Sequence, residues 1–414
     1  MHRLLAALAV SAIGSPLAFA RAGGAADFPA AIPAHWVEND TTLEPRGREF
    51  QFNAVSFSSP EDGWIVGTKY LLHIRGNGRL ELTFTQGLRP VLGTAQALFD
   101  GTLVAGGFRI LDRGEYGVAI GLVLRSSGGR SDVTELSDIP LGDWLISVLR
   151  IDTDGNGWAL GTVIREEAPP IVALLRLRDG VWKLHPLDGA QSGWNLIDLC
   201  LDQNGDGWSV GVTTEDGHWR EPLVVRLIGE RLEEAALPSL PGPHSVLSKV
   251  ACLPGGGAVA VGRSGIAKFM DRGDGLVLRY DGAWHEVELP DSLRGFVPTA
   301  MSAASERDIW MSGSIDDACR TIGRPCRATY IFVHWHDDAW ELSAPPSFPG
   351  SRAEGYLISD LTFVSPDEGW AVANDYAGPE VVRGLIFHYK DGIWRHRNWN
   401  WHFWNQPWFG LFGD

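Results

Sequence analysis

One short pattern recurs along most of the chain, and this repeat limits what the chain can fold into. Each clear copy is an alternating apolar run, a polar turn, and a glycine followed by tryptophan: residues 55–67 (VSFSSPEDGWIVG), 148–161 (VLRIDTDGNGWALG), 198–211 (DLCLDQNGDGWSVG) and 361–373 (LTFVSPDEGWAVA). Weaker copies occupy residues 97–107, 250–262 and 301–313. Alternation of apolar and polar residues predicts strands, so each copy predicts two strands joined by a turn.

A second pattern follows the first. Residues 174–182 (LLRLRDGVW), 276–284 (LVLRYDGAW), 332–340 (FVHWHDDAW) and 385–394 (LIFHYKDGIW) place a short turn between two β-patterned runs. An Asp-Gly pair in that setting is a strong hairpin signal, because a type I′ turn needs positive φ at both central residues. Each unit therefore holds four strands, and the units recur at about 50 residues, the spacing of propeller blades.

These units predict an all-β fold, a seven-bladed β-propeller of four-stranded antiparallel blades spanning residues 51–398. A single four-stranded sheet cannot bury both of its faces. Seven sheets stacked in a closed ring can bury them, and the ring leaves only short outer edges unpaired.

Basic residues and tryptophans recur at fixed positions of the repeat. The third strand of each unit carries a cation: His73, Arg125, Arg176, Arg226, Arg279, His334 and His388. His334 and His336 also lie on one strand face, as a zinc pair would. Because the position recurs in every unit, we interpret these cations as structural, pairing with a carboxylate or lying over a tryptophan of the same or the adjacent blade.

The tryptophans are interpreted in the same way, as core between blades. One set follows the glycine of the first pattern: Trp64, Trp158, Trp208, Trp310 and Trp370. A second set ends the second pattern: Trp182, Trp284, Trp340 and Trp394.

Two of the polar turns resemble a calcium loop, with oxygen-bearing side chains at alternate positions before a glycine. The candidate metal ligands are Asp152, Asp154 and Asn156 in one turn and Asp202, Asn204 and Asp206 in the next. Calcium takes six to eight oxygens, but the position of a closing bidentate glutamate holds Val163 in one loop and Thr213 in the other. We favour hairpin turns capped by Asx side chains. Weak calcium binding, with a Kd on the order of 0.1–1 mM, is the alternative, and no cofactor is required.

The chain has four cysteines. Cys319 and Cys326 lie in one loop, and an exported protein permits their oxidation, so we predict a disulfide there. Cys200 and Cys252 lie in apolar runs and are predicted to be buried thiols.

The two ends differ from the repeat region. Residues 1–20 have the layout of a secretory signal peptide, which predicts export to the periplasm or the extracellular space. Residues 21–50 form an N-terminal arm, either a strand that closes the last blade or a disordered lead. Residues 399–414 are rich in aromatic side chains and predict a plug over the ring, a patch that binds a partner or glycan, or a processing or export signal.

Charge and hydropathy exclude some partners. The net charge of −16 argues against a nucleic-acid ligand. No second segment is apolar and long enough for a membrane span. We expect a monomer with a protein or glycan partner.

The repeated DGW-x-VG followed by DG-x-W resembles bacterial exported propellers related to the photosystem II assembly and stability factor, and more distantly Asp-box (sialidase-like) propellers. The resemblance covers residues 51–398 and specifies fold far better than function. An Asp box separates its glycine from its tryptophan by two residues, whereas here pairs such as Gly63 and Trp64 are adjacent. Sialidase catalysis is therefore carried over to no residue.

Two functions are compatible with this sequence. No nucleophile–base or acid–base set can be located by spacing, which favours a non-catalytic binding or assembly scaffold that uses a propeller face. The alternative is a carbohydrate-active hydrolase or lyase of the sialidase-like type. Arg150 takes an inner-strand position where other units carry Ser56, Cys200 or Thr362. We interpret it as half of a buried ion pair, with projection into the channel as the alternative.

Overall fold

A computed structural model describes residues 51–397 of the chain. Within that range it leaves out residues 69, 77–78, 85–89, 114–115, 128–129, 140–142, 165–170, 188–190, 192, 216–217, 241–243, 266–272, 316–328, 344, 347–355 and 379–380. The signal peptide, the N-terminal arm, the aromatic tail and the loop with Cys319 and Cys326 lie outside the described residues, so the predictions made for them stay predictions.

The described residues form seven four-stranded sheets, one per repeat unit. The first three are β1 (Phe52–Ser59), β2 (Asp62–Gly67), β3 (Tyr70–Arg75), β4 (Arg79–Phe84); β5 (Val91–Ala97), β6 (Leu103–Arg113), β7 (Tyr116–Ser127), β8 (Arg130–Glu135); and β9 (Trp144–Ile151), β10 (Gly157–Val163), β11 (Ile171–Arg178), β12 (Val181–His185). The fourth and fifth are β13 (Trp194–Leu201), β14 (Gly207–Glu215), β15 (His218–Ile228), β16 (Arg231–Glu234); and β17 (Val246–Cys252), β18 (Ala258–Ser264), β19 (Asp274–Tyr280), β20 (Trp284–Glu286). The last two are β21 (Phe296–Ser305), β22 (Asp308–Ile315), β23 (Thr329–His336), β24 (Ala339–Ser343); and β25 (Tyr356–Ser365), β26 (Glu368–Gly378), β27 (Val381–Lys390), β28 (Ile393–His396).

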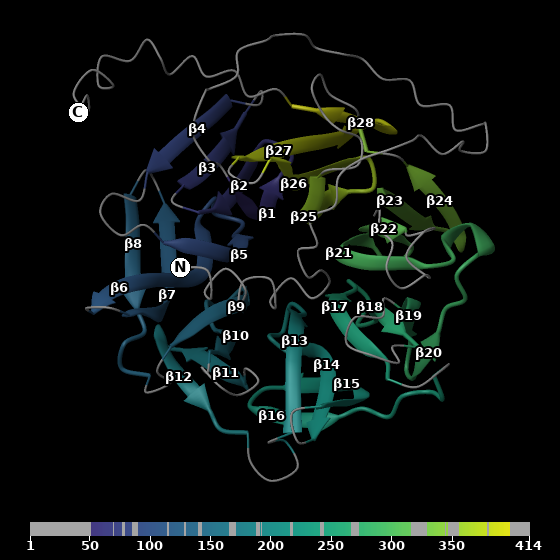
Figure 1. Cartoon of the computed structure of the whole chain (residues 1–414), viewed down its shortest axis with the longest axis horizontal. Helices are drawn as coiled ribbons and strands as arrows, with labels where there is room; N and C mark the ends of the chain where they lie inside the picture. The colour runs from purple at the N-terminus through teal and green to yellow at the C-terminus, as the bar shows by residue number, and fades with distance from the viewer. Residues whose placement is uncertain are drawn as a thin grey trace.

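The sheets are arranged as the blades of a closed ring (Figure 1). Within each blade the strands pair antiparallel in chain order. The first strand of each blade is the inner one and contacts the first strands of both neighbouring blades, all the way round from β1 to β25 and back to β1. This confirms the predicted seven-bladed, all-β propeller.

The hairpin between the third and fourth strands has the predicted turn chemistry. Asp179 and Gly180 have φ of 50° and 75°, and Asp391 and Gly392 have φ of 52° and 81°. Two residues in succession with positive φ are the mark of a type I′ turn, whose twist matches that of the flanking strands.

The tryptophans of the second strands pack between blades, as predicted. Their exposed fraction is 6% or less, for example 0% for Trp158 and 3% for Trp64. Trp158 lies in one apolar cluster with Leu196 and Leu223 of the next blade. Trp370 stacks on Phe57 of the first blade, with ring centroids 4.6 Å apart. Burial of such a large apolar side chain contributes a few kcal/mol, so these contacts hold neighbouring blades together.

The glycine that ends the first pattern is required by close approach of two strands. A Cβ atom built on Gly67 would collide with the carbonyl oxygen of Gln51, and one on Gly211 with that of Asn195. Both glycines lie on second strands opposite an irregularity of the first strand. A side chain at this position would push the inner strand away from its partner.

Side chains of the last blade close the ring. The Asn374 Oδ1 atom accepts a hydrogen bond from the backbone N–H of Phe52 at 2.9 Å, and its Nδ2 donates to the carbonyl oxygen of Phe52 at 2.7 Å. All four described strands of this blade come from residues 356–396. Along the described part of the chain, no helix combines the length and apolarity that crossing a bilayer takes.

Cys200 and Cys252 form a disulfide, so their prediction as buried thiols was wrong. The two residues lie on successive inner strands, β13 and β17, and Cys252 is one residue beyond the position equivalent to Cys200. Inner strands converge toward the ring axis, which brings the two Cα atoms within 5.5 Å. That separation lies in the normal range for a disulfide.

Candidate binding site at the ring axis

One inner-strand position links neighbouring blades. It is the residue opposite the tryptophan position of the second strand: Ser56, Gln96, Arg150, Cys200, Ala251, Ser302 and Thr362. The Ser56 and Ser302 hydroxyls each accept a backbone N–H of the next blade at 2.9 Å. Gln96 exchanges two hydrogen bonds with the backbone of Ile151, at 2.7 and 2.8 Å. The disulfide is the covalent version of the same contact.

Two carboxylates lie two residues before this position on their strands and also bind the neighbouring blade. The Asp198 Oδ2 atom accepts the N–H of Val250 at 3.1 Å. Asp360 accepts the N–H of Val55 at 3.0 Å and that of Leu361 at 2.9 Å. The residue Asp360 as a whole is partly exposed, but its carboxyl group is buried. This burial raises the pKa of the carboxyl group above its usual value. The positive charges of Lys249 and Arg150 act in the opposite sense.

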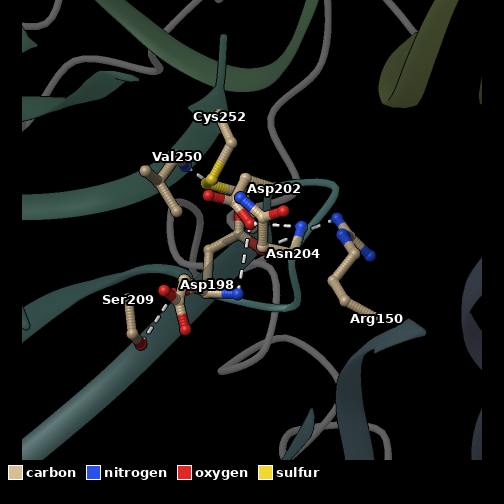
Figure 2. The surroundings of a disulfide bond; sticks show 9 residues. Arg150, Asp198, Asp202, Asn204, Ser209, Val250 and Cys252 are labelled. Atoms are coloured by element: carbon tan, nitrogen blue, oxygen red, sulfur yellow. Dashed lines mark hydrogen bonds and ion pairs between the residues drawn. A yellow bond between two sulfur atoms is a disulfide. The ribbon is translucent and has the colours of Figure 1, made fainter. Parts of the chain in front are cut away.

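Arg150 and Lys249 form what we call the axial cation pair. The Arg150 side chain is 33% exposed, and its Nη2 lies 3.9 Å from Asp198 Oδ1, the limit of an ion pair. Its Nη1 donates to the carbonyl oxygen of Leu149 at 2.8 Å. Figure 2 shows Arg150 and Asp198 among the residues that surround the disulfide. Arg150 is therefore both a partner of a buried carboxylate and partly accessible.

Lys249 is the second cation, from β17. Within the described ranges, its ammonium group has no carboxylate at ion-pair distance. It comes from a different blade than Arg150, yet both charges act on Asp360 from the last blade. The inner strands thus bring two cations and two acidic residues together in a protein whose net charge is −16. Incompletely neutralised cations in a partly shielded place attract anionic groups such as carboxylates.

Six of the seven third-strand cations take the structural role predicted for them. His73, His334 and His388 stack on Trp64, Trp310 and Trp370, with ring centroids 3.7, 4.0 and 3.8 Å apart. Arg176 and Arg226 lie over Trp158 and Trp208 at 4.7 and 5.6 Å, and Arg279 lies over Trp335 of the adjacent blade at 5.6 Å. Because the contact between cation and tryptophan recurs from blade to blade, it belongs to the structure of the blades.

Each of these histidines also bonds a carboxylate at the start of the second strand. His73 Nε2 is 2.6 Å from Asp62, and His388 Nε2 is 3.0 Å from Glu368. Burial lowers the pKa of His73 below its usual value and that of His388 to about 4, although the carboxylates act in the opposite sense. A neutral ring donates from one nitrogen and accepts at the other.

The two calcium-like loops are built as hairpin turns. The Asp152 Oδ1 atom accepts the N–H of Asp154 and of Asn156, both at 2.9 Å. The Asp202 Oδ1 atom accepts the N–H of Asn204 and of Asp206, at 2.8 and 3.2 Å. One oxygen of each first aspartate is thus engaged by its own turn, which is Asx capping.

Weak calcium binding by these loops stays a prediction. The measurement is thermal unfolding in 10 mM calcium against the same buffer with a chelator. Calcium bound with a Kd on the order of 0.1–1 mM would raise the midpoint, because a ligand of the native state alone stabilises it. The same rise in an Asp154→Asn/Asp202→Asn variant would show that calcium acts elsewhere.

Comparisons with known proteins identify the fold. No protein-family model matches the sequence, and no curated protein matches it either. The structure of YCF48 bound to D1 peptide is similar with a TM-score of 0.51 and 13% identity over 82% of this chain and 91% of that one. A streptogramin B lyase is similar with a TM-score of 0.50 and 14% identity over 77% and 89%. At these identities the likeness shows a shared propeller fold.

Sequence reasoning found Arg150 and missed Lys249, Asp198 and Asp360. Lys249 and Asp198 lie in largely apolar runs, and only the register of the inner strands places them at one repeat position, with Asp198 3.9 Å from Arg150. The available signal was that Asp198 and Asp360 share one repeat position, where other units carry residues such as Val148 and Ala300.

Proposed function

We propose that this protein is a non-catalytic binding or assembly scaffold, exported to the periplasm or the extracellular space, that binds an acidic segment of a protein partner at the ring axis. The observation that carries the proposal is the axial cation pair. Arg150 is partly exposed and Lys249 lacks a carboxylate at ion-pair distance among the described residues. A carboxylate of a partner would pair with the positive charges of both side chains.

The other polar groups of the inner strands support a binding role over a catalytic one. Asp198 and Asp360 each accept a backbone N–H of the next blade, so they already serve the ring. A general acid or base needs its proton-carrying atom free to reach a substrate. A propeller of similar fold has been seen bound to a peptide, which makes a protein partner reasonable.

The test uses a set of fluorescent peptides of equal length that are acidic, neutral or basic. We expect the full chain to bind acidic peptides preferentially, and binding to weaken with salt. The variant Arg150→Gln/Lys249→Gln should lose at least tenfold in affinity. Lys183→Gln/Arg294→Gln removes the same charge from exposed positions and serves as the matched control. Equal loss in both variants, or binding that ignores peptide charge, would contradict the proposal.

The alternative is a carbohydrate-active hydrolase or lyase. It would require a pair of carboxyl groups about 5–9.5 Å apart and free to act on a sugar. Release of reducing sugar from polysaccharide by the full chain, abolished by Asp360→Asn in a folded variant, would favour this function over the scaffold.

A further inference from the structure

Three blades share one arrangement of acid, histidine and tryptophan. In the first, sixth and last blades a third-strand histidine stacks on the second-strand tryptophan. In the sixth blade, His334 Nε2 is 3.0 Å from the Asp308 Oδ2 atom, as His73 is bonded to Asp62 in the first. When such a ring is neutral, the carboxylate accepts its Nε2 proton and the lone pair of the ring is on Nδ1.

The blades differ in what faces Nδ1. Arg75 Nε donates to His73 Nδ1 at 3.0 Å in the first blade, and Arg397 Nη2 lies 2.9 Å from His388 Nδ1 in the last. The register places His336 opposite Asp308 as it places Arg75 opposite Asp62. In the sixth blade an imidazole therefore stands where the first blade has a guanidinium.

The sixth blade also keeps the carboxylate that accompanies Arg75 in the first blade. Arg75 lies 3.9 Å from Glu81, the residue paired with His73 on the fourth strand. Glu341 is the residue paired with His334. His334 and Glu341 thus face each other across the strand pair, and His336, two residues further along its strand, shares their face of the sheet.

The ligand atoms of His334, His336 and Glu341 all lie within 4.8 Å of one another. His336 Nε2 is 3.2 Å from Glu341 Oε1, the distance of an ion pair. That nitrogen is nevertheless shielded from solvent and makes no hydrogen bond of acceptable alignment. Of the residues that the structure describes, these three form the one group of histidine, cysteine or acidic side chains close enough to share an ion.

We propose that His334, His336 and Glu341 bind a divalent transition-metal ion, zinc or a neighbour in the first row, which takes the place of the guanidinium present in the first blade. Two imidazole nitrogens and one carboxylate oxygen are a ligand set that zinc prefers, with the fourth position left for water. Zinc–ligand bonds of about 2.0–2.2 Å require the three atoms to approach to about 3.3 Å. Glu341 is 65% exposed and His336 32%, so both side chains are free to make that movement.

The surroundings of His334 fit this role. A metal-binding histidine usually donates its other ring N–H to a carboxylate, which fixes the tautomer and the orientation of the ring. Asp308 supplies that carboxylate, and Trp310 stacks on the His334 ring with ring centroids 4.0 Å apart. Asp308 and Trp310 are therefore positioning residues, and the site is independent of the axial cation pair.

The experiment measures cobalt and zinc binding by the untagged full chain after treatment with a chelator. We expect one equivalent of Co²⁺ to give the visible absorption of a four-coordinate site, and Zn²⁺ to displace it. His336→Arg rebuilds the arrangement of the first blade, so it should fold normally and lose this binding. Asp308→Asn should weaken it by about 10- to 100-fold.

Two controls separate this site from other ligands. His285→Gln removes a half-exposed histidine of another blade, paired with Asp281, and should bind as the wild type does. Glu341→Gln alters an exposed residue and should weaken binding without lowering the unfolding midpoint of the metal-free protein. A wild type that binds no more metal than His336→Arg, or a Glu341→Gln protein with unchanged affinity, would overturn the proposal.

Discussion

His388 shows how burial sets the chemistry of a single residue in this fold. It is 4% exposed, stacks on Trp370 at 3.8 Å and bonds Glu368 at 3.0 Å. Burial is the largest influence and lowers its pKa to about 4, with Arg397 and Lys390 acting in the same sense. Burial also lowers the pKa of His396 to about 4. Both residues belong to the blade that closes the ring.

These pKa values predict loss of stability in mild acid. The unfolded chain takes up the proton near pH 6.5 and the folded chain only near pH 4, so the unfolded state binds more protons between these values. The free energy of unfolding should therefore be full above about pH 6.5 and fall as the pH drops toward 4. Urea unfolding across this range measures it. His388→Gln should flatten the fall, and a slope identical to that of the wild type would contradict the pKa of His388.

The sequence could predict the role of His388 but not its full set of neighbours. A cation that recurs in each unit must serve the blade, and adjacent tryptophans identify its contact. Arg397, however, lies nine residues away, just after β28, and only the fold brings it to the imidazole ring of His388. The same holds for His336, whose neighbour Glu341 is on another strand.

Side chains of the inner strands bond to the inner strand of the next blade. The disulfide between β13 and β17 is one of these bonds, and it closes a loop with a sequence separation of 52, one repeat unit. Apolar flanks made each cysteine look like core, which is why the sequence prediction failed. The register provides the missing signal, since Cys200 faces Trp208 and Cys252 is one residue beyond Ala251, which faces the equivalent Val259.

Replacement of both cysteines should destabilise the protein. Cys200→Ser/Cys252→Ser frees a loop of one unit in the unfolded chain, which costs about 2–4 kcal/mol of unfolding free energy. Urea unfolding of variant and wild type measures the difference. Peptide mapping without reductant should find Cys200 linked to Cys252, and the same map tests the predicted link between Cys319 and Cys326. A variant as stable as the oxidised wild type would show that the bond adds nothing.

The whole molecule is a ring in which the first and last blades meet. Among the described residues, no covalent bond links these two blades. Its blades share apolar clusters with both neighbours, so the core runs continuously round the ring. The repeat pattern was sufficient to predict blade number and strand order, because each unit is local in sequence. It could not predict closure, which joins Phe52 to Asn374, residues 322 positions apart.

Closure by Asn374 should control the stability of the entire ring. Its side chain makes two hydrogen bonds to the backbone of Phe52 and is 1% exposed, so Asn374→Ala removes buried bonds across the joint. We expect a loss of about 1–3 kcal/mol in the free energy of unfolding. Because every blade packs against two neighbours, tryptophan fluorescence and far-UV circular dichroism should still report one coincident transition, shifted to a lower urea concentration.

Asn204→Ala changes an exposed turn residue, so it is the matched control and should leave the urea midpoint unchanged. Two separated transitions in the wild type would mean that blades unfold independently, and an unshifted midpoint in Asn374→Ala would mean that apolar contacts such as Phe57 against Trp370 close the ring by themselves.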